Sequence, residues 1–403
     1  MLRSVAVKRN SPAAAFIKKL HRDLVRFGRD DALLIDIGSA TAFVWDPDFT
    51  SPASATLREE ALNMRLGGMR ATLAAQEALF PADYFDPFGM DFANLAIDVV
   101  PCVDAPSQAM FNYISYGQSV AAETKTMRIG RFLIYDRTPS PHRIMGAIAL
   151  KSPKYFDGAR DRHLGWPALS EMVDGERIKS DAAIKLRNAA LKSIFNIAVC
   201  MAVPPYDRHG VGKLIAALAL SHPVIGHMET KYPNCVLGVT TTGIWSGSAG
   251  QYERIRLGRD MIADQRAKLY ERTHTVRRSL NYVPAHFSQA TYEAAFDMIR
   301  RSHVRIQPFH GYDADPAICQ HLLNAALLHL RIPRRAIAAN VISHYFGSVS
   351  LACREALATV ATLNHPPTER SLAIGEIYAE WLTRTAMPAE HDVAPARLSA
   401  RAT

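Results

Sequence analysis

The sequence predicts a mixed α/β fold whose core is a mostly antiparallel sheet flanked by helices. Two apolar segments at 131–136 and 144–150 enclose a turn at Thr138–Pro141, which is the pattern of a β-hairpin. The uninterrupted apolar run Ile194–Val203 has the length of a strand and is ended by two prolines, so it suits a strand buried on both faces. A helical spacing of apolar residues follows at Val211–Ser221.

Further elements are predicted on both sides of this core. Pro12–Gly28 carries apolar residues on one face and Lys or Arg on the other, which predicts an amphipathic helix. That helix either packs against the acidic segment that follows it or lies on an acidic surface. Lys179–Leu191 is a predicted helix, and Val224–Thr230 and Cys235–Thr241 are predicted strands. Another helix is expected to start at Asp315-Pro316, where a capping acid precedes a proline.

The length of 403 residues is enough for two or three folding units. We expect four consecutive segments. An N-terminal amphipathic helix and acidic α+β region covers 1–115, the core covers 116–260, a mainly helical C-terminal region covers 261–387, and a flexible tail covers 388–403.

The net charge of +9 is unevenly distributed: residues 1–30 carry +6, residues 31–115 carry −9, and the remainder carries +12. A basic body is compatible with a polyanionic partner such as DNA, because phosphate neutralisation supplies most nucleic-acid affinity. The alternative is a solvated basic surface without a nucleic-acid partner.

The five cysteines are odd in number, widely spaced and contain no CxxC pair, which favours reduced thiols in the cytoplasm. No apolar stretch reaches the roughly 18 residues of a membrane span, and the N-terminus lacks the apolar core of a signal peptide. We therefore expect a soluble cytoplasmic protein without membrane contact.

One motif points to a bound cofactor. Residues 194–213 read IFNIAVCMAVPPYDRHGVGK, which is a buried strand, a proline break, a turn with two glycines and the start of a helix. The first N–H groups of a helix are unpaired and the helix dipole is positive there, so such a turn can hold a phosphate by its backbone. An ordinary strand-to-helix turn is the alternative. The candidate cofactor-binding residues are Val203, Arg208, His209, Gly210, Val211, Gly212 and Lys213.

This motif resembles the acyl-CoA-binding signature of the GNAT acetyltransferase superfamily, in which a strand delivers a V-x-P-x-Y-R-x-x-G-x-G-like segment to the pyrophosphate. The resemblance implies acetyl-CoA or a related acyl donor as cofactor. Asp207 stands where that pattern has Arg or Gln, and Arg208 follows one residue late. Either Arg208 takes the role of the missing cation or the cofactor is not CoA.

Four segments, Gly146–Trp166, the strand with Asn196, His227–Thr230 and Gly243–Gly258, extend the likeness. Together they are similar to the core of the Druantia anti-phage protein family and, more distantly, to Mom-type phage DNA-modification proteins. The likeness covers about 130 residues, and ARDRHLGW is its most specific part. It implies a phage or anti-phage setting with DNA as the partner.

The ARDRHLGW segment is a candidate nucleic-acid contact. Arg160, Asp161, Arg162 and His163 combine charges with the aromatic ring of Trp166, a grouping suited to holding a phosphate or stacking on a base. An internal ion pair between Asp161 and an arginine that only fixes the loop is the alternative.

Three further residues are candidates for catalysis. Glu229, at the end of a predicted strand, can serve as general base, or it forms a surface salt bridge with Lys231 or Arg208. Tyr252 can protonate a leaving thiolate, or it is a packed ring in a polar turn. Asn196 interrupts an apolar run, so its amide either orients a ligand or satisfies a bulge.

Two weaker patterns remain. His227 and Glu229 would share one strand face as two metal ligands, but no third ligand is identifiable, so no metal site is predicted. Arg331, Arg334 and Arg335 lie in the segment Leu327–Ala356, which is either a DNA-contacting helix pair or a basic solvated rim.

These patterns favour an acyltransferase-like protein that modifies DNA bases in a phage or anti-phage setting. The first alternative is a nucleic-acid-binding defence protein that keeps the fold without the chemistry. The second is an N-acyltransferase that acts on a small-molecule or protein amine.

Overall fold

The computed structural model describes residues 3–26, 32–45, 70–86, 88–118, 128–173, 176–207, 210–243, 250–279, 287–301, 316–333 and 340–385. The chain divides into two compact units, Met1–Arg70 with Val276–Ile342 and Ala71–Thr275 with Ser343–Thr403. This division differs from the consecutive segments expected from composition, because residues 276–342 pack with the beginning of the chain.

The first unit has a three-stranded antiparallel sheet in the order β1-β3-β2, and its described residues also form the helices α1, α9 and α10. Phe16, Ile17 and Leu20 of the first helix are fully buried together with Phe43 of the central strand. The elements are β1 Arg3–Lys8, α1 Pro12–Arg26, β2 Leu33–Ile37, β3 Ala40–Trp45, α9 Gln289–Ile299 and α10 Pro316–His329. The amphipathic helix predicted at Pro12–Gly28 is therefore confirmed, and it packs within its own unit.

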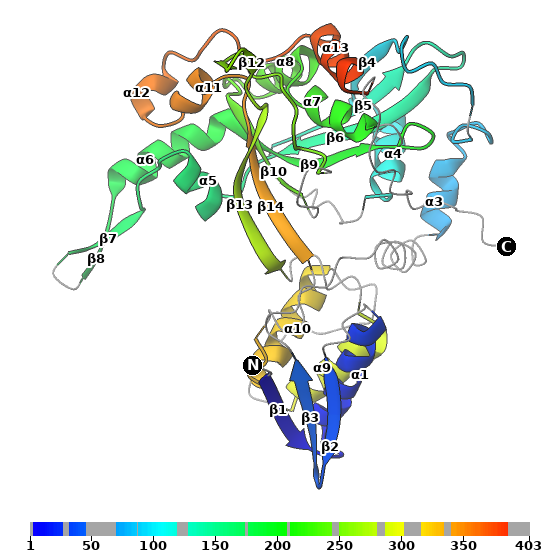
Figure 1. The fold of residues 1–403 in the computed structure, drawn as a ribbon, viewed down its shortest axis with the longest axis vertical. Helices are drawn as coiled ribbons and strands as arrows, with labels where there is room; N and C mark the ends of the chain where they lie inside the picture. The colour runs from blue at the N-terminus through cyan, green and yellow to red at the C-terminus, as the bar shows by residue number, and fades with distance from the viewer. Residues whose placement is uncertain are drawn as a thin grey trace. The chain divides into compact units, whose positions relative to one another are not determined.

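The second unit is built around a seven-stranded sheet in the order β13-β14-β10-β9-β6-β5-β4 (Figure 1). Strands β9 and β10 are parallel, whereas the β10–β14, β9–β6, β6–β5 and β5–β4 pairings are antiparallel. The predicted mixed, mostly antiparallel sheet flanked by helices is confirmed. Its strands are β4 Ile97–Pro101, β5 Ile129–Asp136, β6 Arg143–Lys151, β9 Ile194–Ala202, β10 Gly238–Gly243, β13 Tyr270–Ser279 and β14 Asn340–Gly347.

Helices and short hairpins complete this unit. The helices are α3 Arg70–Glu77, α4 Ala105–Ser115, α5 Gly158–His163, α6 Asp181–Ala190, α7 Val211–Leu218, α8 His222–Lys231, α11 Leu351–Glu355, α12 Val360–Leu363 and α13 Ile374–Thr385, with a 3₁₀ turn η1 at Leu191–Ser193. The hairpins are β7 Ser170–Val173 with β8 Glu176–Lys179, and β11 Met261–Ile262 with β12 Gln265–Arg266. The β7–β8 hairpin projects from the rest of the unit beyond α5 and α6 (Figure 1).

Strand β9 is buried on both faces, as its sequence predicts. Phe195 and Ile197 face a core that includes side chains of α7, α8 and α13, whereas Val199 faces a second core with Phe111 of α4. Because both faces are filled, the two ends of β9 are where this strand can present groups to a ligand.

The strand predicted at Val224–Thr230 is wrong, because these residues lie in α8. Pro223 occupies the first turn of α8, where proline is favoured. The buried residues of this helix, Val224, Ile225 and Met228, have helical spacing. The strand predicted at Cys235–Thr241 is confirmed in part, because β10 covers Gly238–Gly243.

The C-terminal third is less helical than predicted. Strands β13 and β14 lie within it, and β14 occupies the middle of the segment Leu327–Ala356 that was considered for a DNA-contacting helix pair. Arg331 lies in a left-handed turn after α10 with φ 57°. Arg334 and Arg335 lie outside the described residues.

We expect Gly146→Ala to destabilise the protein by roughly 1–3 kcal/mol, because a Cβ at this position on β6 would collide with the Met201 carbonyl oxygen of β9 and lie 2.9 Å from Ile215 Cδ1. Gly226→Ala is the matched control. Nothing lies within 4 Å of its Cβ position on α8, so roughly 0.4–1 kcal/mol of stabilisation is expected. Urea unfolding of both variants measures the difference, and equal midpoints would contradict the close β6–β9 approach.

Candidate functional site

The turn between β9 and α7 is the first candidate site. The Val203 N–H donates to the Met145 carbonyl at 3.0 Å, so pairing with β6 continues to the residue at which the chain leaves the sheet. Gly210 then adopts the left-handed conformation, with φ 72° and ψ 13°, and is the N-cap of α7 without a side-chain capping bond. Glycine is suited to this backbone conformation because it has no Cβ. Arg208 and His209 lie outside the described residues.

This turn is held by groups from distant parts of the chain. The Gly210 carbonyl accepts hydrogen bonds from the Lys213 N–H at 2.9 Å and from Trp381 Nε1 at 3.2 Å. A Cβ on Gly212 would lie 3.8 Å from the Gln251 side chain, and Val211 is fully buried. Gly210 itself is exposed. The start of α7 is thus held by these hydrogen bonds and by the burial of Val211, whereas its cap residue Gly210 is exposed to solvent.

Lys213 brings a cation to the same turn. Its Nζ donates to the carbonyls of Gly250 and Glu253 at 2.7 and 2.8 Å. Burial, and then the nearby Arg384, lower the pKa of Lys213 to about 8 against the opposing charge of Glu253. The exposed Arg254, with φ 65°, adds a weaker effect of the same sign. The charges of three cationic side chains therefore interact near the start of α7, and Arg384 is itself paired with Glu380 at 2.7 Å.

Tyr252 packs in the core beside this turn. It is 6% exposed, and its ring centroid lies 5.1 Å from that of Tyr270 and 5.4 Å from that of Tyr345. Burial, and next the neighbouring Cys200, raise the pKa of Tyr252 well above 10, so its phenol stays protonated at neutral pH. Gln251 Nε2 donates to the Cys200 Sγ at 2.9 Å. Burial raises the pKa of the Cys200 thiol to about 12, which leaves it a neutral group.

Glu229 lies on α8, so the strand-end position from which its role as general base was argued is wrong. Its Oε1 accepts from the Val236 N–H at 2.8 Å and from Arg370 Nε at 3.1 Å, and its Oε2 accepts from Arg370 Nη2 at 3.2 Å. The alternative left open by the sequence was a salt bridge with Lys231 or Arg208, whereas the partner in the structure is Arg370. Lys231 instead donates to the Ile129 carbonyl.

The suggested metal pair also fails on geometry. On a helix, His227 and Glu229 do not share a face, because residues two apart point in different directions. The His227 ring packs edge-on against Phe132, with centroids 5.3 Å apart. In the described part of the chain, no group of three His, Cys, Asp or Glu side chains could hold a metal ion.

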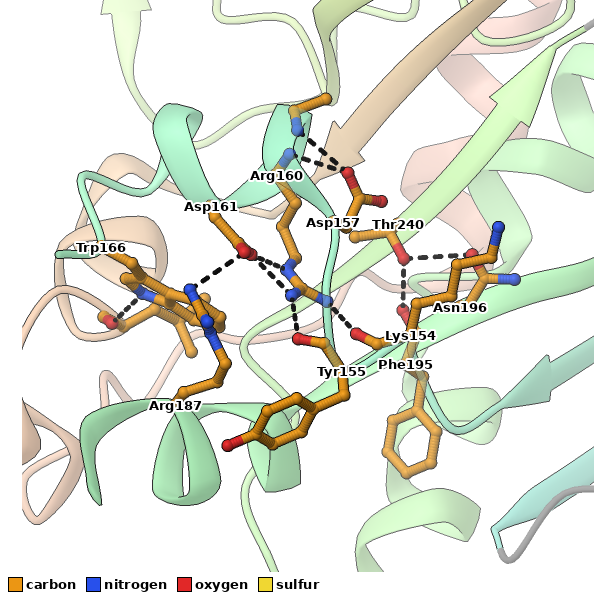
Figure 2. Close-up of polar contacts among 12 residues, drawn as sticks. Lys154, Tyr155, Asp157, Arg160, Asp161, Trp166, Arg187, Phe195, Asn196 and Thr240 are labelled. Carbon is orange, nitrogen blue, oxygen red and sulfur yellow. Dashed lines mark hydrogen bonds and ion pairs between the residues drawn. The ribbon is translucent and has the colours of Figure 1, made fainter. Parts of the chain in front are cut away.

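Asn196 joins the two parallel strands. Its Oδ1 accepts from Thr240 Oγ1 of β10 at 3.1 Å (Figure 2). Its Nδ2 donates to the Ile197 carbonyl at 3.2 Å. Thr240 and Asn196 are direct partners in the β9–β10 register. The amide within the apolar run is thus satisfied inside the sheet, as buried polar groups require.

The ARDRHLGW segment forms a buried ion-pair network (Figure 2). Arg160 is 2% exposed, and its Nε and Nη2 donate to Asp161 Oδ1 at 2.9 and 2.6 Å. The other Asp161 oxygen pairs with Arg187 Nη2 of α6 at 3.0 Å. One carboxylate therefore pairs with two buried guanidinium groups, one at each oxygen.

The Trp166 ring packs against both guanidinium groups of this network. The Arg160 Cζ lies 4.9 Å from its ring centroid and the Arg187 Cζ lies 5.6 Å from it, while its Nε1 donates to the Leu357 carbonyl at 2.8 Å. The expectation that Arg160, Asp161 and Trp166 contact nucleic acid conflicts with this burial. The alternative of an internal ion pair describes them instead.

The other two candidate residues of the segment, Arg162 and His163, are more accessible. Arg162 is exposed. His163 lies 3.5 Å from Glu271 Oε2, and its ring centroid lies 5.6 Å from that of Phe346. Burial lowers the pKa of His163, partly opposed by the charge of Glu271.

Sequence reasoning missed Arg187 and Arg370. Arg187 carried a readable signal, because it falls with Ala183, Leu186 and Ala190 on the buried face of α6. A charge at such a position needs a buried partner. No local signal marked Arg370, which pairs with Glu229 across 141 residues of sequence.

The described residues form a mixed α/β protein with a glycine turn at the start of α7 and a buried Arg-Asp-Arg network that joins α5 to α6. Residues 83–242 match the model of the family described as Druantia protein DruA. The matched range contains both the Gly210 turn and the Arg160 network. It supports the Druantia resemblance found from sequence, and with it an anti-phage defence context.

No curated protein and no solved structure matches the chain. Among the described residues, none of the helices combines the length and the apolar character needed to cross a bilayer.

We expect Asp161→Asn to lower the free energy of unfolding by about 3–5 kcal/mol, because it leaves the charges of Arg160 and Arg187 buried without a counterion. Asp98→Asn is the control, since its 2.7 Å pair with Arg137 is exposed on both sides. That change should cost about 1 kcal/mol or less. Chemical denaturation compares the two, and similar losses would contradict the buried network.

Proposed function

We propose that this chain is an acyltransferase-like protein that acts on DNA in anti-phage defence and holds a phosphate-bearing donor, acetyl-CoA or a related compound, at the start of α7. The observation that carries the proposal is the exposed, left-handed Gly210 cap of α7, placed directly after the central strand β9. Backbone N–H groups at such a helix start favour a phosphate.

Two further features support this ligand class. Three cations, Lys213, Arg254 and Arg384, interact near the turn against two acids, Glu253 and Glu380, so positive charge is in excess there and favours an anion. The GNAT resemblance implies a strand that leads into a glycine segment, and β9 is followed by the Gly210 turn and α7.

The chemistry is proposed with Tyr252 as the proton donor to a leaving thiolate, since its phenol keeps its proton at neutral pH. Tyr252 is only 6% exposed, so this role requires that the ligand reach into the core beside Cys200. Glu229 is the weaker half of the predicted acid-base pair, because both of its carboxylate oxygens already accept bonds from Arg370.

These two observations favour a second candidate, a DNA-binding defence protein without transfer chemistry. Mass spectrometry of nucleosides from DNA incubated with the protein and an acyl donor separates the two. A mass added to a base supports transfer, and loss of that product in Glu229→Gln would support the base role. Unmodified DNA together with tight DNA binding would favour the binding protein.

Donor binding should weaken as pH rises. Lys213 carries its charge below its pKa of about 8 and loses it above, so phosphate affinity should fall as pH rises through about 8 or, because a bound anion raises that pKa, somewhat higher. Lys213→Met should reduce the affinity for acetyl-CoA roughly 10- to 100-fold at pH 7, the range for one charged hydrogen bond. Isothermal titration calorimetry measures both effects.

Lys213→Arg is the control for charge, because guanidinium does not titrate in this range and the pH dependence should flatten. Gly210→Val should abolish binding, since φ 72° is strained for a β-branched residue. If the unaltered protein shows no heat with acetyl-CoA, nucleotides or pyrophosphate, the donor site is wrong.

DNA affinity should fall steeply with salt, because the +12 charge of residues 116–403 provides for several phosphate contacts. Each contact contributes a slope of roughly −0.9 in a plot of log affinity against log salt. Arg162→Gln should reduce that slope by about one contact, whereas Arg137→Gln, which removes a charge already paired with Asp98, should change it less. Fluorescence anisotropy at four salt concentrations measures this dependence. An affinity that does not change with salt would contradict the proposal that DNA is the partner.

A further inference from the structure

The loop between β6 and α5 displays two large aromatic side chains on the surface of the second unit. Tyr155 is 39% exposed and Phe156 is 67% exposed, whereas Trp166 of the neighbouring segment is 8% exposed. The two exposed rings pack edge to face, with centroids 4.9 Å apart and an interplanar angle of 82°. Because the two rings are exposed, their aromatic surface is accessible to a partner.

The backbone beneath these rings is held rigidly by the buried arginine. Arg160 Nη1 donates to the Lys154 carbonyl at 2.6 Å, and Arg160 Nη2 donates to the Tyr155 carbonyl at 3.1 Å (Figure 2). Asp157 then caps α5 by accepting from the N–H groups of Ala159 and Arg160 at 3.1 and 3.2 Å. The loop is anchored immediately before and after Phe156, so little backbone entropy is lost when the rings bind a partner.

Positive charge accompanies the rings. The Arg187 Cζ lies 5.9 Å from the Tyr155 centroid and 5.8 Å from the Phe156 centroid, while its guanidinium is paired with Asp161. Lys154 precedes the aromatic pair and is exposed, and Arg162 is exposed on the adjoining helix α5. The acid in the loop, Asp157, is engaged by the helix cap.

We propose that Tyr155 and Phe156 form a stacking platform for the bases of single-stranded DNA, with Lys154 and Arg162 positioned for its phosphates. The proposal rests on the function proposed above, in that DNA is the partner. Flat rings beside cations match a strand whose bases expose their faces and whose backbone is anionic. A duplex would not fit as well, because its bases stack on each other and expose only their edges in the grooves.

The test is fluorescence anisotropy with two labelled 12-nucleotide probes, oligo-dT and an abasic strand of the same length and charge. The unaltered protein should bind oligo-dT more tightly than the abasic strand. In Tyr155→Ala with Phe156→Ala, affinity for oligo-dT should fall roughly 5- to 100-fold for each ring that stacks, while affinity for the abasic strand stays within about threefold. Both side chains are exposed, so the variant should keep the melting temperature of the unaltered protein.

Matched variants separate stacking from other roles of the loop. Tyr155→Phe keeps the π-face and should retain binding, whereas Phe156→Leu keeps apolar bulk without an aromatic face and should lose most of the preference for bases. Equal affinity of the unaltered protein for the two probes, or an unchanged preference in the double variant, would overturn the platform. Loss of self-association in the double variant without any change in the preference for bases would also overturn it and assign the rings to a protein contact.

An acetyl-CoA titration of the same double variant keeps this test separate from that of the donor site. Unchanged acetyl-CoA binding with lost base preference supports the platform. If no DNA of any kind is bound while acetyl-CoA is, both the platform and the DNA partner are wrong, but the donor site stands.

Discussion

The carboxylate of Asp161 pairs with two buried arginines, and the arrangement of the β6–α5 loop, α5 and α6 depends on that pairing. Through Arg160 it fixes the carbonyls of the β6–α5 loop, and through Arg187 it ties α5 to α6. Trp166 packs on both guanidinium groups and reaches the Leu357 carbonyl, almost 200 residues further along the chain. Removing one charge from such a network is costly because the others stay buried. The most recognisable sequence segment is therefore a scaffold, and the surface that it supports is what can meet a ligand.

The doubly buried strand β9 imposes a second constraint. Because cores fill both of its faces, functional groups can gather only at its ends and in the connections that follow. At one end, Asn196 and Thr240 join the parallel pair, and the loop with Tyr155 lies in the same region (Figure 2). Past the other end, Gly210 opens α7. The Gly210 turn and the aromatic loop thus follow different ends of the β9 region, so the proposed donor and the proposed DNA strand would occupy separate sites.

Periodicity predicted the elements whose burial is regular, and it failed where a single residue or a distant partner decided. Strand β9, the β5–β6 hairpin and helices α1, α6 and α7 lie where the apolar spacing places them. Helix α8 was mistaken for a strand because Pro223 can end one helix or begin the next, and sequence alone does not distinguish the two. The ARDRHLGW segment was recognised, but sequence left a nucleic-acid contact and an internal ion pair as alternatives, because Arg187, the partner that makes burial possible, lies on another helix. Exposure of Tyr155 and Phe156 had no sequence signal, since aromatic residues are usually buried.

The electrostatics of Lys213 give a physical reason to propose that the Gly210 turn binds an anion. Its lowered pKa means that the folded protein holds this proton less tightly than the unfolded chain does, so the charged side chain opposes folding at neutral pH. Two carbonyls accept hydrogen bonds from its ammonium group, but a neutral side chain of similar length would fill the same space without the desolvation penalty. Arg384 increases that penalty through like charge. A bound phosphate would reverse both effects, because it supplies the counterion that the fold itself provides only in part. Lys213 and Arg254 carry like charge near a helix start that has no side-chain cap, whereas Arg384 is already paired with Glu380, and this arrangement favours an anion beside Lys213.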